Sequence, residues 1–199
     1  MKVLRFLVIT LALCSLPGFA AKNGFGLGFS SFSPDDDSTE LTFDVDSEPF
    51  FEIFYRLQIG AHNVVVSVGA TSWDNEVPGG FSASLDFVPI GASYRYLPWH
   101  DKPVTLVVGG GLSIIAYDAE LESSGPIVFT SESGALTAIE PIVGVEFFAN
   151  KLARLHVTAK YSWQIASADD IVNPQLVVPL DVDMTGFYVT AGASFLFGD

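Results

Sequence analysis

Eight charged or titratable side chains fall on the polar faces of segments whose polarity alternates from residue to residue. They are Glu52, Arg56, Arg95, Glu140, Glu146, Arg154, His156 and Lys160. Carboxylates and basic groups that share an enclosed space are expected to pair, because a buried charge without a partner is very costly. These residues therefore predict a network of ion pairs inside the protein.

Part of this set also has the composition of a hydrolytic site. His156 and Thr158 lie two residues apart, and Glu140 or Glu146 could face them across a hairpin. A nucleophilic hydroxyl needs a base that is hydrogen-bonded to it and an acid that orients the base. Threonine is an uncommon nucleophile, so the sequence favours a structural, polar role for His156.

Acidic residues gather between the first two alternating segments, where Asp35, Asp36 and Asp37 form the densest cluster. Ca²⁺ and Mg²⁺ take several oxygen ligands, which makes these three aspartates the candidate metal ligands. The spacing of an EF-hand is missing, and the sequence does not identify a metal. No cofactor is expected.

The segment 152–164 shows the alternation most clearly. Arg154, His156 and Lys160 alternate there with Leu155 and Tyr161. Successive side chains of an extended backbone point to opposite faces, so this pattern predicts a strand with one apolar and one charged face. Seven further segments show the same alternation, and they cover residues 24–31, 50–59, 64–71, 81–96, 104–117, 138–148 and 186–197.

Eight segments of about the 9–11 residues that cross a bilayer obliquely predict an all-β protein, an eight-stranded antiparallel up-and-down transmembrane β-barrel. Residues 81–87 have the opposite parity to the rest of their segment, which predicts a bulge or break near Val88 and Pro89. Aromatic residues near segment ends, among them Trp73, Tyr161 and Trp163, predict interfacial girdles.

The connections between these segments alternate in length. Those at 60–63, 97–103 and 149–151 are short, and those at 33–49, 73–80, 118–135 and 166–185 are long. Outer-membrane barrels have short periplasmic turns and longer extracellular loops. The alternation therefore indicates which end of the barrel faces the cell exterior.

Charge distinguishes the two ends as well. The chain has 23 acidic and nine basic residues, with a net charge of −14, which excludes nucleic acid as a partner. The long connections contain neither Lys nor Arg. They are predicted to be acidic loops, with Asp74, Glu76, Asp86, Asp118 and Glu120 among their members.

Residues 1–20 have the features of a secretory signal peptide, with Lys2 and Arg5 before an apolar run and small residues before the expected cleavage after Ala20. Residues 21–199 are then predicted to form a single outer-membrane β-barrel domain. The only cysteine, Cys14, lies in the signal peptide, so no disulfide is expected.

Residues 22–197 resemble the small outer-membrane barrels of the OmpA, OmpX and OmpW kind. The most specific part is the last segment, where Phe187, Val189, Phe195 and Phe197 alternate in a pattern similar to the C-terminal signal read by the barrel-assembly machinery. The resemblance implies a protein of the bacterial outer membrane. Its expected partners are membrane lipid, lipopolysaccharide and the assembly machinery, with divalent cations possible at the acidic loops.

The hairpin of the sixth and seventh segments suggests a register for the charged residues. A three-residue loop at 149–151 would place Glu146 opposite Arg154 and Glu140 opposite Lys160. Both apolar faces would then point outward, and the pairs would plug the interior.

Three functions follow from these observations. The first is a non-catalytic membrane protein that uses its acidic loops in surface interaction or envelope stability. The second is a passive, porin-like channel for small hydrophobic or cationic solutes, as the resemblance to OmpW implies. The third is an outer-membrane lipid-modifying enzyme that uses His156.

Overall fold

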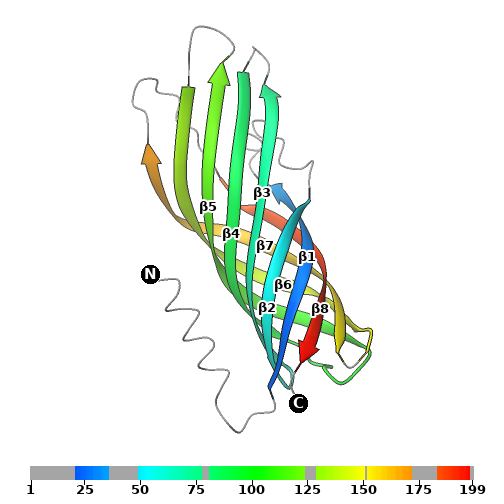
Figure 1. Ribbon diagram of the computed structural model, residues 1–199. Coiled ribbons are helices and arrows are strands. Elements are labelled where there is room, and N and C mark those ends of the chain that lie inside the picture. The colour runs from blue at the N-terminus through cyan, green and yellow to red at the C-terminus, as the bar shows by residue number, and fades with distance from the viewer. Residues whose placement is uncertain are drawn as a thin grey trace.

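The computed structural model describes residues 21–35, 49–77, 81–123, 129–150, 152–171 and 183–197. Eight strands form a closed antiparallel barrel in sequence order, in which β1 pairs with both β2 and β8 (Figure 1). The strands are β1 (Ala21–Pro34), β2 (Phe50–Ile59), β3 (His62–Val77), β4 (Phe81–Tyr96), β5 (Val104–Ser123), β6 (Phe129–Phe148), β7 (Ala153–Ile171) and β8 (Gly186–Phe197). The predicted all-β, eight-stranded architecture is confirmed. None of the described residues belongs to a helix long and apolar enough to cross a membrane.

The end of the barrel drawn at the bottom of Figure 1 carries the short connections. The turn between β2 and β3 consists of Gly60 and Ala61, and Gly60 has a φ of 58°, a conformation that favours glycine. The backbone N–H of Leu97 donates to the carbonyl of Ala61 at 2.8 Å, so this turn is tied to the connection between β4 and β5. The three connections predicted to be short are short, although β3 already begins at His62 and β7 begins only at Ala153.

Several strands are longer than the sequence predicted. The strands β3 and β4 have 16 residues each, β5 and β6 have 20, and β7 has 19. The long connections placed at 73–80 and 118–135 are therefore wrong wherever the structure describes them, and the one placed at 166–185 is wrong at 166–171, with 172–182 lying outside the described residues. Since about 9–11 residues suffice to cross a bilayer, these strands are long enough to project well beyond one.

A bulge near Val88 and Pro89 is absent, because β4 keeps one register with each of its neighbours, but the pairing with β3 is broken there, since Val88 and Pro89 have no partner on β3. Val68 pairs with Ile90 and Thr71 pairs with Phe87, with no shift between them. What reverses is the polarity of the side chains and not the backbone. The register shift that the described strands do contain lies between β6 and β7, at Thr137 and Ala138.

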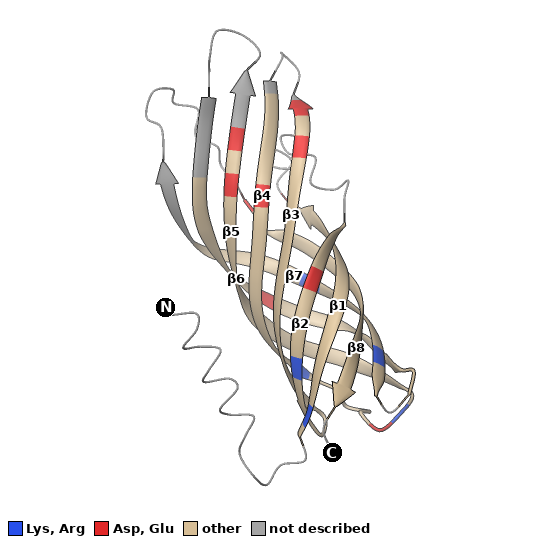
Figure 2. Cartoon of the chain, viewed as in Figure 1, with Lys and Arg blue, Asp and Glu red and all other residues tan. Residues whose placement is uncertain are grey.

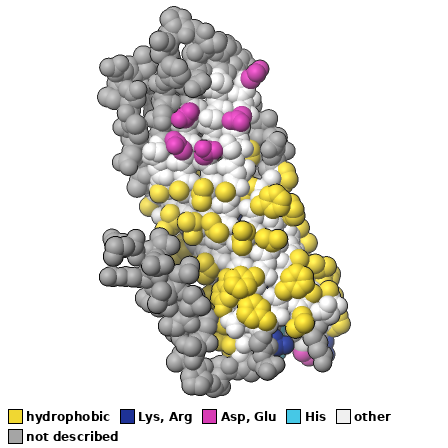
Figure 3. Space-filling view, in the orientation of Figure 1, with side chains coloured by type: hydrophobic (Ala, Val, Ile, Leu, Met, Phe, Trp, Pro, Cys, Tyr) yellow, Lys and Arg dark blue, Asp and Glu magenta, His cyan; other side chains and the backbone are white. Residues whose placement is uncertain are grey.

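The outer surface has two zones. The first, which we call the apolar belt, consists of exposed apolar side chains from all eight strands. It includes Phe25, Leu27, Ile53, Val68, Ile90, Leu112, Ile114, Val143, Val157 and Val189. Above it lies the acidic collar, visible in magenta in Figure 3, which is formed by Asp74, Glu76, Asp86, Asp118 and Glu120. The assignment of these five acidic residues to loops is wrong, since they lie on the outer faces of β3, β4 and β5 (Figure 2).

The interior has two zones as well. Below, it contains the charged residues described in the next subsection. Above, it contains a cluster of buried apolar side chains, which we call the aromatic core. Its members include Phe32, Phe50, Trp73, Leu85, Phe87, Ile115, Tyr117, Leu136, Met184 and Tyr188. Trp73 is only 2% exposed, so its assignment to an interfacial girdle is wrong.

Candidate functional site: the charged lumen

The lower lumen contains a carboxylate between two guanidinium groups. Arg56 on β2 donates to Glu146 on β6 through both terminal nitrogens, at 2.8 Å and 3.2 Å. The Nε of Arg154 on β7 lies 3.6 Å from Oε1 of the same carboxylate, and all three side chains are buried. Arg154 also lies over the ring of Phe148, 3.7 Å from its centroid. A paired carboxylate of this kind lowers the cost of burying two cations in a narrow space.

A second ion pair lies higher in the lumen. The ammonium of Lys160 on β7 is 3.2 Å from Oε1 of Glu140 on β6. Glu140 also accepts a hydrogen bond from Ser113 on β5 at 2.9 Å. Lys160 lies 4.6 Å from the ring centroid of Tyr188, which belongs to the aromatic core, so the ion pair and the core are in contact.

The register expected for β6 and β7 is wrong by two residues. Glu146 pairs with His156 and Ile142 pairs with Lys160, whereas the sequence predicted Glu146 opposite Arg154 and Glu140 opposite Lys160. The side chains of Glu146 and Arg154, and of Glu140 and Lys160, nevertheless meet diagonally. Long charged side chains reach such diagonal neighbours readily.

Glu52 and Arg95 lie between these two sets. Glu52 on β2 accepts hydrogen bonds from the hydroxyls of Ser30, at 3.1 Å, and Ser67. Arg95 on β4 donates from Nε to Ser93 at 3.2 Å. Among the described residues, no carboxylate oxygen forms an ion pair within 4.0 Å of the Arg95 guanidinium.

His156 is packed as part of the lumen wall. Its ring contacts Phe54 edge to face, with 5.2 Å between the ring centroids, and a Cβ added to Gly192 would lie 2.7 Å from its Cε1. Glu146 faces His156 in the register, but both oxygens of that carboxylate are bound by Arg56. The group that would have to orient a catalytic base is therefore already engaged by a cation.

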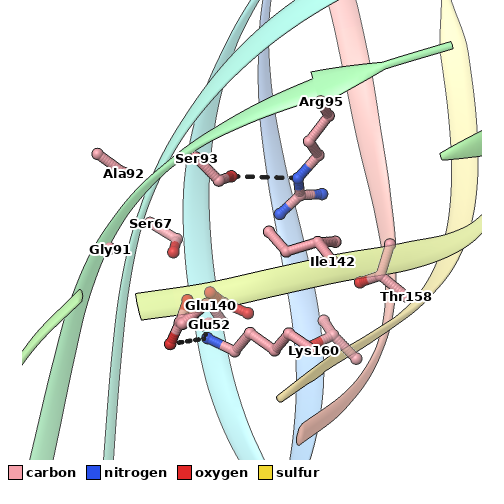
Figure 4. Close-up of a pocket in the computed structure, with 11 residues that line it drawn as sticks. Glu52, Ser67, Gly91, Ala92, Ser93, Arg95, Glu140, Ile142, Thr158 and Lys160 are labelled. Carbon is pink, nitrogen blue, oxygen red and sulfur yellow. Dashed lines mark hydrogen bonds and ion pairs between the residues drawn. The ribbon is translucent and has the colours of Figure 1, made fainter. Parts of the chain in front are cut away.

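A small cavity lies at the centre of the charged lumen. Its volume is about 10 Å³, and the residues that line it come from β2, β3, β4, β6, β7 and β8 (Figure 4). Those used below are Glu52, Ser67, Arg95, Glu140, Thr158 and Lys160. We call it the mid-lumen cavity.

The candidate metal ligands are only partly described. The Tyr161 hydroxyl donates to the carboxylate of Asp35, and Asp36 and Asp37 lie outside the described residues. Within the described part of the chain, no three His, Cys, Asp or Glu side chains are grouped closely enough to hold a metal ion. The predicted signal peptide, residues 1–20, also lies outside the described residues.

The sequence reasoning missed the aromatic core altogether. Phe32 and Phe87 lie 6.3 Å apart with stacked rings, and Phe87 is 5.2 Å from Trp73. A signal was present, because Leu85 and Phe87 alternate with Ser84 and Asp86 on the opposite parity from the belt residues of the same strand. That alternation is the pattern of a strand with a water-facing outer side.

No family model and no curated protein matches the chain. Solved structures do. The chain is similar to the outer membrane protein OprG from Pseudomonas aeruginosa, with a TM-score of 0.67 and 16% identity over 91% of this chain and 98% of that one. The fold is that of an eight-stranded outer-membrane β-barrel.

Two further structures share this barrel fold. A major outer membrane protein from Thermus thermophilus has a TM-score of 0.56 and 14% identity, over 89% of this chain and 100% of that one. Ail, the attachment invasion locus protein of Yersinia pestis, has a TM-score of 0.51 and 16% identity, over 89% of this chain and 97% of that one. At these identities the likeness extends to the fold alone.

Proposed function

We propose that the protein is an integral, non-catalytic barrel of the bacterial outer membrane whose lumen is closed. Its acidic upper end would serve surface interaction or envelope stability. The observation that carries this proposal is the apolar belt around a charged, internally paired lumen. A barrel that stays in water would carry the opposite arrangement, with charges outside and apolar residues inside.

The belt is too large for a protein surrounded by water. Leu27 is 57% exposed, Leu112 58% and Phe195 67%, and similar residues continue around every strand. Monomeric soluble proteins rarely expose contiguous apolar patches larger than a few hundred Å². Lipid acyl chains are the medium in which such a surface is stable, and the closed barrel leaves no unpaired strand edge within the belt.

The ends of the barrel give its orientation. The short turns would lie in the periplasm, and the acidic collar would lie outside the cell, as is typical of outer-membrane barrels. The collar begins just above the belt (Figure 3), where it would face the headgroup layer. We propose lipopolysaccharide as its neighbour, with divalent cations bridging the collar to lipid phosphates. We also propose that the assembly machinery reads β8.

A closed lumen is supported by its contents. The aromatic core lies above the ion pairs, and the mid-lumen cavity, at about 10 Å³, has room for about one water molecule. An eight-stranded barrel is just wide enough for side chains to fill it. This packing argues against a passive channel for hydrophobic or cationic solutes, which becomes one outcome of the test below.

The test has two stages. Migration on a gel with and without heating shows whether the purified protein forms a heat-modifiable barrel. The folded protein is then placed in a planar bilayer, and single-channel conductance is recorded. We expect no openings, and reproducible openings of the wild-type protein would contradict the closed lumen.

A matched pair of variants makes the result sharper. Glu146→Gly removes a carboxylate side chain from the lumen, and Glu120→Gly removes the same side chain from the collar. If the ion pairs close the lumen, only Glu146→Gly can introduce openings. Openings of equal size in both variants would show that the current does not pass through the charged lumen.

A further inference from the structure

The mid-lumen cavity borders the ion pair of Glu140 and Lys160. Arg95 and Glu52 are on its wall together with Glu140 and Lys160 (Figure 4). We propose that this cavity is a binding site for one ordered water molecule, which bridges the Arg95 guanidinium to the Glu52 carboxylate. The bridge would join Arg95, whose Nε donates to Ser93, to Glu52, which accepts from Ser30 and Ser67.

The size of the cavity limits its occupant. A volume of about 10 Å³ is about the least that admits a single water molecule, which also needs two to four polar partners. Glu52, Ser67, Arg95 and Thr158 line the cavity and can supply these partners. A sugar, a phosphate or any organic solute is too large.

The charges around the cavity limit the occupant further. The carboxylates of Glu52 and Glu140 would repel an anion, and Arg95 with Lys160 would repel a cation. A neutral, dipolar molecule fits both, because it can accept from a guanidinium and donate to a carboxylate. One water molecule can do both at once. A water bridge of this kind is nearly as favourable as a direct hydrogen bond.

The bonding of Arg95 gives an independent reason for the water. Its Nε donates to Ser93 at 3.2 Å. Glu52 exerts the largest electrostatic attraction on the guanidinium, yet the two form no ion pair within 4.0 Å. Arg95 is half-buried, and those N–H groups of a guanidinium that do not reach bulk water require acceptors. The proposed water would supply one such acceptor for Arg95 and would itself donate a hydrogen bond to Glu52.

Gly91 provides a way to displace the water. It lines the cavity, and an added Cβ would lie 3.3 Å from the Ser67 hydroxyl, so that Gly91→Ala places a methyl group in the space. Gly110→Ala is the matched control. Gly110 is exposed on the outer face of β5, and its added Cβ would lie 3.6 Å from the carbonyl of Glu140.

The first measurement is urea unfolding of both variants in lipid vesicles. Alanine in a strand is favoured over glycine, so Gly110→Ala should keep or raise the urea midpoint. We expect Gly91→Ala to lower the midpoint and Gly91→Ser to recover at least half of that loss, because the serine hydroxyl can take the place of the water oxygen. Equal midpoints for Gly91→Ala and Gly110→Ala would overturn the proposal.

The second measurement looks for the water itself. In the folded wild-type protein, nuclear magnetic cross-relaxation should connect a long-lived water to protons that line the cavity, and the signal should disappear in Gly91→Ala. Its persistence in that variant, or its absence in the wild type, would overturn the proposal. The inference rests on the proposed function only in treating the lumen as closed. Single-channel conductance tests the closed lumen separately. The bound water can be detected whether or not the barrel conducts.

Discussion

The strand β5 passes through two regions of the molecule that are built in opposite ways. Within the belt, Leu112 and Ile114 are exposed and Ser113 is buried. Above the belt, Asp118 is exposed and Tyr117 is buried. The backbone keeps one parity throughout, so the exchange of polarity between its faces is what a change in the surrounding medium, as proposed above, would require.

The two regions also differ in what stabilises them. In the belt, lipid would cover the outer face, so the interior can be polar provided that its charges are paired. In the collar, water would cover the outer face, and the burial of large aromatic rings inside stabilises the wall, as in a soluble protein. The loss of a charged side chain should therefore destabilise the lower lumen most, and the loss of side-chain volume should destabilise the upper lumen most.

The largest expected effect comes from removing the central carboxylate of the lower lumen. Glu146→Gln leaves Arg56 and Arg154 buried without their anion, which should lower the free energy of unfolding by about 3–5 kcal/mol. Glu120→Gln removes the same charge from the collar, where an exposed substitution should change stability by about 0.5 kcal/mol or less. Urea unfolding in lipid vesicles measures both. Similar losses in the two variants would show that the lower lumen is no more sensitive to charge than the collar.

Removal of volume from the aromatic core should have the next largest effect. Phe87→Ala leaves a cavity in the upper lumen and should lower the free energy of unfolding by about 3 kcal/mol. Phe51→Ala is the control, because Phe51 is 60% exposed in the belt and leaves no enclosed cavity. The same unfolding assay compares them. If Phe51→Ala lowers the free energy of unfolding as much as Phe87→Ala does, the stability of the upper lumen does not depend on a packed core.

Introducing a cation on the outer face of β5 tests the change of medium. Leu112→Arg places a charge in the belt. It should lower the free energy of unfolding by about 2 kcal/mol, because a charge facing acyl chains is poorly solvated. Asp118→Arg changes an outward residue of the same strand in the collar and should cost little. The comparison is made by unfolding in vesicles of uncharged lipid. A smaller loss for Leu112→Arg than for Asp118→Arg would contradict the assignment of the belt to lipid.

The smallest expected effect concerns repulsion within the collar. Asp86 and Asp118 are directly opposite each other on β4 and β5, and like charges in such positions destabilise a sheet. Asp86→Asn should therefore raise the free energy of unfolding by about 0.5 kcal/mol at low salt. The gain should diminish at high salt, because salt screens exposed charges. A gain that does not depend on salt would mean that repulsion is not its cause.

The sequence predicted the parts of the fold that follow from local alternation. It identified the eight strands, their order and the short connections, and it assigned Glu140, Glu146 and Lys160 to one side of their strands. It mistook the upper strand segments for loops because their polarity is inverted. The strands were recognised by an apolar face that points outward. Asp118 and Glu120 point outward and are charged, so this pattern could not identify them as strand residues.

The errors in the charged lumen have a different origin. The register between β6 and β7 depends on the turn between them, where the side chain of Asn150 accepts hydrogen bonds from the backbone of Leu152 and Ala153 at 2.8 Å and 2.7 Å. This turn is longer than the expected three-residue loop. The pairing of Arg56 with Glu146 joins residues 90 positions apart on strands that are not neighbours. It arises from closure of the barrel, and no local pattern contains it.

The change of medium along β5 can be measured directly. Leu112→Cys, Ile114→Cys, Asp118→Cys and Glu120→Cys each introduce one attachment site for a spin label, since the only native cysteine, Cys14, lies in the predicted signal peptide. The folded variants in lipid vesicles are exposed in turn to oxygen, which concentrates in acyl chains, and to a water-soluble nickel complex. Labels at 112 and 114 should collide mainly with oxygen, and labels at 118 and 120 should collide mainly with nickel. The same preference at all four positions would contradict the central claim that β5 leaves the membrane between Ile114 and Asp118.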